Sequence, residues 1–251
     1  MSPQLATRET PEEEPSVVRA EKGDCVEAVR LIFAPLKQKD GFRHGAIGCP
    51  GSGKTHGLRK VVAAALDQEI VDVALTHDVK GADPEWYGYY CRTVAECRAE
   101  LLARERHAVF RGDVLTDVAC DVEGVALKGK EMLQRERLRV LLNVGELKDA
   151  LTEGGKGWRS PTTLWFSAQA RSLRGCFTWT VQQPKRVPDE IWDQSTTIAM
   201  HRVLKRSVNY LRNTLELDDE MVAVLPQLAR GEFVLYQPEA DWNGKVYRWP
   251  A

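Results

Sequence analysis

Residues 42–68 read FRHGAIGCPGSGKTHGLRKVVAAALDQ, and the eight residues GCPGSGKT lie at positions 48–55. The residues before the glycines form a short apolar run typical of a buried strand, and those after them have helical spacing. The pattern GxxxxGK[ST] between a strand and a helix is the context in which this motif binds phosphate. Its glycines let backbone N–H groups turn toward a phosphate, and the helix N-terminus adds its dipole.

The motif therefore predicts a phosphate-binding loop (P-loop) with separate tasks for its side chains. Lys54 reaches the β- and γ-phosphate oxygens, and the Thr55 hydroxyl can ligate Mg²⁺. We expect nucleotide contacts from the whole loop: Gly48, Cys49, Pro50, Gly51, Ser52, Gly53, Lys54, Thr55 and His56.

Composition places the chain among ordinary globular proteins. It has 251 residues, 43% of them hydrophobic, and a formal net charge of −1. That charge argues against a uniformly basic surface that coats nucleic acid, but not against a local basic loop. Six cysteines without a CxxC pair indicate reduced thiols in a cytosolic protein rather than a disulfide framework or a zinc site.

The chain ends and the apolar runs define the expected organisation. Residues 1–18 are polar, acidic and proline-containing, which predicts a disordered tail and no signal peptide. No apolar run approaches the roughly 18 residues that span a bilayer. We therefore expect a cytoplasmic protein with a single domain over 19–251, including an N-terminal helix at 23–39 and a C-terminal strand or hairpin at 237–251.

Strand and helix patterns alternate along this domain. Besides the strand before the P-loop, apolar runs predict strands at 69–78, 107–113, 138–144, 176–184, 196–203, 231–237 and 245–249. Helical patterns lie at 55–68, 93–105, 117–136, 160–175 and 189–195, and in two pieces of 206–228 broken around Leu217 and Asp218. Such alternation predicts an α/β P-loop NTPase fold with a central, mainly parallel sheet flanked by helices.

The strand at 138–144 raises a question about hydrolysis. Proteins with a P-loop usually end such a strand in an Asp-Glu pair for the magnesium ion and the attacking water, but here Gly145 precedes Glu146. Loss of that first carboxylate weakens magnesium retention. Asp78 and Asp113, each at a predicted strand end, are candidate substitutes, and Glu146 could itself anchor the metal.

Four stretches in order resemble the HerA/FtsK family of ring-forming DNA translocases and its viral packaging relatives. They are DVALTHDVKGADPEWYG at 72–88, the stretch from LRVLLNVGEL to SLRG at 138–175, the stretch from CFTWTVQQP to AMHRV at 176–203, and the stretch from NYLRNTLEL to GEFVLY at 209–236. An arginine-rich lid of adenylate-kinase type and an NKxD guanine-binding motif are absent from the sequence. The likeness covers about residues 40–237, as in the minimal ATPase core of phage packaging enzymes.

The resemblance implies roles at matching positions. Glu146 would polarise the attacking water, and Gln182, in VQQP where the family has TQRP, would sense the γ-phosphate. A Gln amide can both donate to phosphate and accept from water. Arg171 would be the arginine finger that reaches a neighbouring subunit, with Arg174 and Arg202 as alternatives.

The resemblance also implies ligands and partners. These are ATP, Mg²⁺ held through water by Thr55 and Glu146, double-stranded DNA, and a homo-oligomeric ring, a hexamer. A capsid or nuclease partner, and location in the virion if a phage encodes the chain, follow from the same likeness. Departures from the family pattern are Gly145 and, at the arginine of TQRP, Gln183.

Three functions remain open from the sequence. The first is an ATP-driven DNA translocase or packaging motor; the second is a nucleotide-gated scaffold or switch with weak or no hydrolysis because of Gly145. A motor for export or virion assembly at a membrane is third, and the lack of an anchor counts against it. Basic residues near DNA would be Lys156 and Arg159 beside Trp158, and Lys128 and Lys130, although ordinary surface charge explains them equally well.

Overall fold

The protein is described by a computed structural model. It covers residues 21–35, 40–78, 86, 88–91, 93, 96–97, 106–111, 122–147, 160–238, 240 and 243–250. The expected tail at 1–18, Asp113, and the basic loop with Lys156, Trp158 and Arg159 lie outside these residues.

The described strands form one ten-stranded sheet in the order β1-β10-β9-β8-β2-β7-β6-β3-β5-β4. In chain order they are β1 (Glu21–Gly23), β2 (Arg43–Ile47), β3 (Val73–Asp78), β4 (Tyr89–Cys91), β5 (His107–Arg111), β6 (Val140–Val144), β7 (Cys176–Val181), β8 (Thr197–His201), β9 (Glu232–Tyr236) and β10 (Lys245–Arg248). Within this set only the pairings of β9 with β8 and β10 are antiparallel. The predicted α/β fold with a mainly parallel sheet is confirmed.

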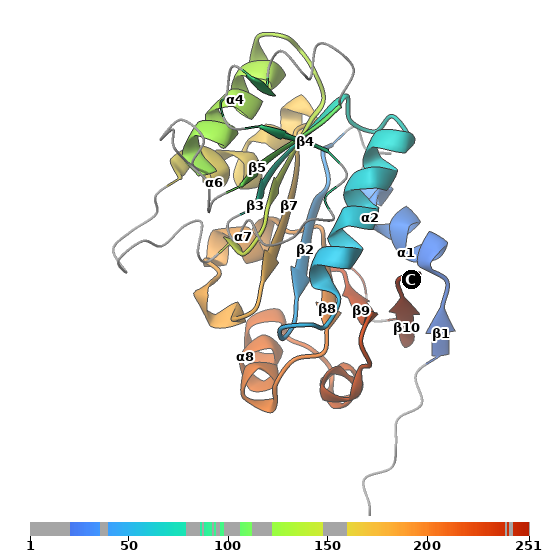
Figure 1. The fold of residues 1–251 in the computed structure, drawn as a ribbon. Coiled ribbons are helices and arrows are strands. Elements are labelled where there is room, and N and C mark those ends of the chain that lie inside the picture. Colours follow the sequence, from blue (N-terminus) through green and yellow to red (C-terminus); the bar gives the residue numbers. More distant parts are fainter. Residues whose placement is uncertain are drawn as a thin grey trace, which may run out of the picture.

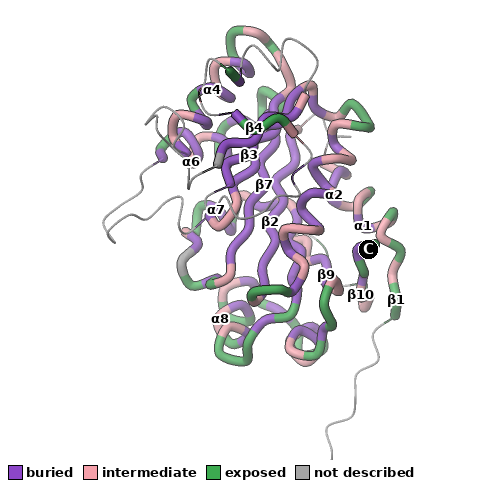
Figure 2. Tube along the Cα trace, in the orientation of Figure 1, coloured by how far each residue is buried: buried purple, intermediate pink, exposed green. Residues whose placement is uncertain are grey.

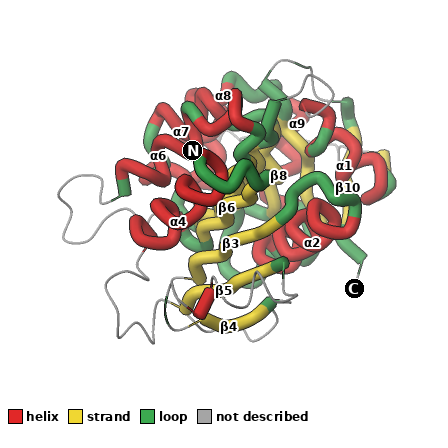
Figure 3. The backbone as a smooth tube through the Cα atoms, turned by 90° about the horizontal axis from the view of Figure 1, so that it is seen from above, coloured by secondary structure: helices red, strands yellow, loops and turns green. Residues whose placement is uncertain are grey.

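Helices cover both faces of the sheet (Figure 1). They are α1 (Cys25–Ile32), α2 (Lys54–Asp67), α4 (Val122–Gln134), α6 (Pro161–Ala168), α7 (Asp189–Gln194), α8 (Lys205–Leu215) and α9 (Asp219–Val224), with short 3₁₀ turns η3 (Ala170–Leu173), η4 (Pro184–Arg186) and η5 (Leu225–Gln227). The helices α1 and α2 pack on one face, and α4, α6 and α7 lie across the sheet from them, as the view from above shows (Figure 3).

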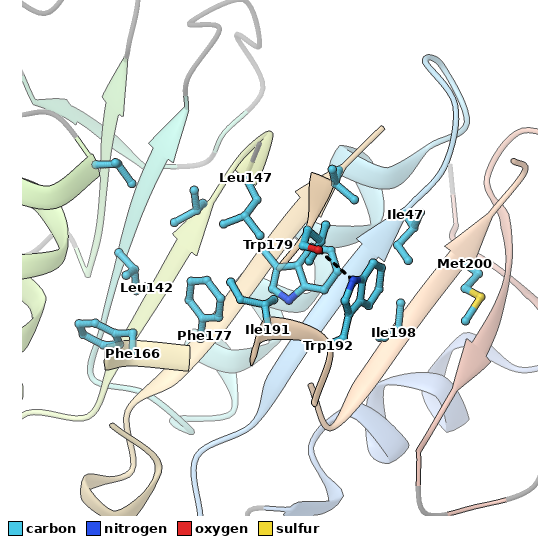
Figure 4. Packing of buried hydrophobic residues seen from close by; sticks show 14 of the residues in the cluster. Ile47, Leu142, Leu147, Phe166, Phe177, Trp179, Ile191, Trp192, Ile198 and Met200 are labelled. Carbon is cyan, nitrogen blue, oxygen red and sulfur yellow. Dashed lines mark hydrogen bonds between the residues drawn. The ribbon is translucent and has the colours of Figure 1, made fainter. Parts of the chain in front are cut away.

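The central strands are buried on both faces (Figure 2). This explains why the sequence of β6 is a nearly continuous apolar run. On the face of α6 and α7, Trp179 of β7 contacts Trp192 of α7 edge to face at 5.4 Å, and the Trp192 indole donates to the Val187 carbonyl at 3.1 Å (Figure 4). A Cβ at Gly45 would overlap the Trp179 ring, so β2 carries a glycine where that indole crosses it. Burial of each indole contributes about 5 kcal/mol by its area.

Two short strands were not predicted. Each of them, β1 and β4, has three residues. The strand β1 pairs with β10, and β4 pairs with β5. A three-residue strand carries too little alternation to stand out in a sequence. The strand β1 also displaces the start of α1 from the expected residue 23 to Cys25, where the Asp24 side chain caps the helix by accepting from the Val26 N–H at 3.0 Å.

Two details of the predicted helices become visible. Thr93 and Glu96 form a capping box with both reciprocal bonds, at 3.1 and 3.3 Å. The helix expected over 160–175 divides into α6 and η3, and the left-handed residue at its end is Arg174 with φ 60° rather than Gly175. Gly175 is required instead by packing, since a Cβ there would lie 2.7 Å from the Cβ of Ala170.

Candidate functional site

Three predicted site segments meet at one edge of the sheet. The strands β2, β7 and β6 are neighbours and parallel, so their carboxyl ends lie together. The P-loop follows β2, Gln182 follows β7, and Glu146 follows β6 one residue after Gly145. In Figure 1 this edge lies toward α8. The P-loop, Gln182 and Glu146 therefore follow three adjacent parallel strands.

The P-loop has the conformation that its glycines allow. Gly51 and Gly53 have φ angles of 71° and 103°, a region that favours glycine. A Cβ at Gly51 would have no atom within 4 Å. The helix α2 begins at Lys54 with Gly53 as its N-cap and no side chain that caps it, so the first-turn N–H groups have no side-chain acceptor at that cap. The Lys54 ammonium donates to the Cys49 carbonyl at 3.0 Å across the loop.

Segments distant in sequence fix the P-loop from behind. The Cys49 N–H donates to the Arg202 carbonyl after β8 at 2.8 Å, and the Gly231 N–H before β9 donates to the Ser52 carbonyl at 2.9 Å. A Cβ at Gly53 would lie 3.0 Å from the Cα of Gly231, so the two backbones approach closely. The family-like ending around Gly231 therefore serves to hold the loop.

The C-terminal strand reaches the first turn of α2. The His56 ring bonds the Pro250 carbonyl at 2.8 Å, and a Cβ at Gly57 would overlap the indole of Trp249. Trp249 stacks on Phe233 at 4.6 Å. Because the His56 imidazole is occupied in this way, a nucleotide contact by His56 falls to its backbone N–H.

A buried histidine lies beneath the loop. His201 ends β8 with no exposed surface, and burial, followed by the charge of Lys54, lowers its pKa to about 3. Burial also lowers the pKa of His44 on β2 to about 3, with a smaller effect of His201. Both rings are neutral at physiological pH, so they add no positive charge behind the phosphate cradle.

Glu146 is held in an uncommon backbone conformation. Its φ is 49°, a left-handed value that costs a non-glycine residue roughly 1 kcal/mol. Two groups from β7 accompany it: its N–H donates to the Thr180 hydroxyl at 2.8 Å, and its carboxylate accepts from the Gln182 amide at 2.6 Å. The two residues predicted to act on water and on the γ-phosphate are thus in direct contact.

The residues present fit magnesium only in part. The Thr55 hydroxyl and the Glu146 carboxylate are the hard oxygen ligands that this ion prefers. Among the described residues no group of three His, Cys, Asp or Glu side chains could hold a metal alone. Retention of a magnesium ion would therefore depend on nucleotide phosphates and on water as further ligands, which is usual for this ion.

The predicted arginine finger lies at the other end of β7. Arg171 is in η3, before the strand begins, and pairs with Asp40 at 3.2 Å. The six residues of β7 span about 20 Å, so Arg171 cannot reach the P-loop of its own chain. Arg174 is at the same end, whereas Arg202 follows β8 directly beside the P-loop and is exposed.

The two described lysines suggested for DNA contact lie in α4, within the helix predicted at 117–136. Lys128 is buried and pairs with Glu131 at 2.8 Å. Lys130 lies over the Trp165 ring at 4.6 Å. The first of these ammonium groups is therefore not available to a phosphate backbone, which corrects the prediction for Lys128.

Comparison with known proteins bears on the fold. No protein-family model matches the sequence, and no curated protein matches it. Solved structures do match in fold. In fold, the chain is similar to a viral genome-packaging NTPase. That protein, B204 of Sulfolobus turreted icosahedral virus 2 in complex with AMPPCP, is 13% identical with a TM-score of 0.61 over 84% of this chain and 98% of its own.

Two further structures agree. VirB4 of Thermoanaerobacter pseudethanolicus has 11% identity and a TM-score of 0.61, over 83% of this chain and 90% of its own. EssC ATPases 2 and 3 from Geobacillus thermodenitrificans have 12% identity and a TM-score of 0.53, over 78% of this chain and 37% of that chain. All three structures are 11–13% identical to this chain, so the likeness is one of fold. Within the described part of the chain, no helix is long and apolar enough to span a membrane.

Sequence reasoning missed the residues that support the site. Thr180 lies two positions before Gln182 on the same face of β7, a spacing that could have suggested a shared task. His201, the Arg202 carbonyl and the Gly231 N–H reach the P-loop only through pairing of β2 with β8 and of β8 with β9. No local pattern announces such contacts.

Proposed function

We propose that the chain binds and hydrolyses ATP as a DNA translocase of the HerA/FtsK type, most specifically a viral genome-packaging motor. The observation that carries this is the meeting of the P-loop with Glu146 and Gln182 at the carboxyl ends of three adjacent parallel strands. The structural likeness to B204, which binds an ATP analogue and is described as a genome-packaging NTPase, supports it.

The chain's own residues divide the work. N–H groups of the loop and of the first turn of α2 would bind phosphate oxygens, and Lys54 would leave the Cys49 carbonyl to neutralise them. Bound magnesium would neutralise phosphate charge, with the Thr55 hydroxyl as its protein ligand. Glu146 orients the attacking water, and Gln182 must release the Glu146 carboxylate before its amide can turn to the γ-phosphate.

A cavity of about 630 Å³ borders the same edge and is proposed as the space for the part of the nucleotide beyond the phosphates. Cys49 and Pro50 of the P-loop, Gln182, and the first residues of α8 line it. Arg206 and Lys185 also line this cavity, so its charge suits an anionic ligand.

The proposal of DNA and of a ring rests on the structural likeness to B204 and on the position of Arg171. Because Arg171 lies about 20 Å from its own P-loop, an arginine finger at this residue requires a neighbouring subunit, as in a homo-oligomeric hexamer. Double-stranded DNA is the substrate proposed for such a ring, and a capsid or nuclease partner is proposed with it, in the cytoplasm or the virion.

The test is steady-state ATPase activity with and without duplex DNA. We expect turnover in the native chain, loss in Lys54→Ala with loss of ATP binding, and loss in Glu146→Gln with binding kept. Gln182→Ala should lower turnover, whereas the adjacent and exposed Gln183→Ala is its matched control. Turnover no higher than that of Lys54→Ala would refute hydrolysis, and turnover unaffected by DNA would refute the translocase. Sedimentation with ATP tests the hexamer.

Two observations favour a second function. Gly145 removes a carboxylate for magnesium, and the Glu146 carboxylate accepts a hydrogen bond from the Gln182 amide. These features suit a nucleotide-gated scaffold or switch with weak or no hydrolysis. ATP binding and ATP-dependent assembly without turnover would support this function and contradict the motor.

A further inference from the structure

Gly145 stands where a carboxylate is expected, and the adjacent strand β3 carries Asp78 beside it. Val144 of β6 pairs in register with His77 of β3 and with Trp179 of β7. One residue farther along, Gly145 therefore lies between Asp78 and Thr180. The Gly145 N–H donates to the His77 carbonyl at 2.9 Å, which continues the ladder to this point.

Asp78 faces the side of the sheet that α2 covers. Ala74, four residues earlier on β3, belongs to the hydrophobic cluster that includes α2. Side chains alternate along a strand, so Thr76 and Asp78 point the same way. The bond from Asn143 of β6 to the Thr76 hydroxyl, at 3.1 Å, lies on that face one row below Gly145 and Asp78. Asp78 is thus in the row, and on the face, of the absent carboxylate.

Gly145 leaves a gap in this row. A Cβ at position 145 would lie 3.4 Å from the His77 carbonyl oxygen and 3.9 Å from the Asp78 Cα, which is ordinary contact distance. Its φ is not in the left-handed region. Neither backbone nor space therefore requires glycine here. The absence of a side chain opens the path from Asp78 toward Thr180 and the strand next to the P-loop.

The distance to be bridged suits water. Adjacent strands are about 4.8 Å apart, so Asp78 is one strand spacing farther from the P-loop than a carboxylate at 145. Magnesium keeps several of its waters and is often held by carboxylates through them. One additional bridging water spans much of a strand spacing, and a Cβ at 145 would have only the His77 carbonyl oxygen and the Asp78 Cα within 4 Å.

We propose that Asp78, acting across the gap left by Gly145, supplies the carboxylate that retains the hydrated magnesium ion at the P-loop. This presupposes the ATP binding proposed above. It assigns the metal-anchoring task to β3 and leaves Glu146 for the attacking water, so a single carboxylate does not have to perform both tasks.

The decisive experiment moves the carboxylate between strands. The probes are Mn²⁺, followed by electron paramagnetic resonance, and a fluorescent ATP analogue titrated with Mg²⁺. We compare Asp78→Asn, Gly145→Asp and the double variant, with Asp193→Asn, an exposed acid on α7, as the matched control. Asp78→Asn should raise the Mg²⁺ concentration at half-saturation at least 10-fold while ATP affinity in EDTA is unchanged. The double variant should recover to within about 3-fold of the native chain.

Gly145→Asp alone makes the test independent of whether Asp78→Asn folds. If Asp78 already anchors the metal, this substitution tightens Mg²⁺ by less than about 3-fold; tightening of 10-fold or more would show an unfilled position and overturn the proposal. The proposal would also be overturned if Asp78→Asn and Asp193→Asn reached half-saturation at the same Mg²⁺ concentration. Loss of nucleotide binding is scored separately, since native binding no better than that of Lys54→Ala contradicts ATP binding itself.

Discussion

Acid should destabilise the fold through His44 and His201, well above the range in which carboxylates titrate. Both pKa values are about 3 in the folded protein, against 6.5 for an ordinary histidine, chiefly because of burial. Since the unfolded chain takes up these protons first, stability is complete above pH 6.5 and falls as pH decreases from there toward 3. At pH 5.0 each histidine costs roughly 2 kcal/mol of stability and at pH 7.5 almost none, so the pair removes roughly 4 kcal/mol between these values.

Urea unfolding at pH 7.5, 6.5 and 5.0 measures this loss. The native chain should lose about 4 kcal/mol more than the double variant His44→Gln/His201→Gln between the outer two values, and each single variant should remove about half. Asp72 does not contribute to the change between pH 7.5 and 5.0. The hydrogen bond from Arg139 lowers the pKa of its carboxyl group below 3.8, so its contribution to stability is lost only at lower pH. Equal losses in the native chain and the double variant would refute the assignment of the acid sensitivity to these two rings.

Three further outcomes test the supports of the site and the sheet. Thr180→Val should lower kcat about 10-fold with ATP affinity unchanged, and Thr180→Ser should restore it, because the hydroxyl accepts the Glu146 N–H; stopped-time ATPase assays and binding titrations measure both. Asn143→Leu should cost about 3 kcal/mol in urea unfolding, since its amide accepts from Thr178 and donates to Thr76; an unchanged midpoint would contradict this. Trp249→Ala should cost about 4 kcal/mol and speed hydrogen exchange in the first turns of α2, whereas exchange limited to β10 would contradict the contact with Gly57.

The P-loop and the sheet could be predicted because their signals are local. A glycine pattern, a Lys-Thr pair and a following helical period lie within residues 42–68. The buried strands were recognisable as apolar runs, since helices cover both faces of the sheet. Gln182 and Glu146 required only that the ends of β6 and β7 meet, which parallel pairing ensures.

The other features of the site depend on contacts between strands, and the sequence does not reveal which strands are neighbours in the sheet. The pattern around Arg43 predicted a strand but not that its buried guanidinium would donate to the carbonyls of Phe166, Ser167 and Gly41, with burial lowering its pKa to about 10. Likewise both Asp78 and Asp113 end predicted strands. Only the register of β3 with β6 distinguishes Asp78, since it places that residue beside Gly145.

The position of Arg171 bears on how a ring of such chains would work. The strand β7 carries Gln182 at its carboxyl end and follows the turn with Arg171 at its other end. This strand is fully buried and pairs with β2 on one side and β6 on the other. If Arg171 serves the neighbouring subunit, one strand joins the γ-phosphate sensor of its own site to the finger of the next. Release of Glu146 by Gln182 in one subunit would then be felt at the adjacent site without any additional element, and loss of the Arg171–Asp40 pair would be its local sign.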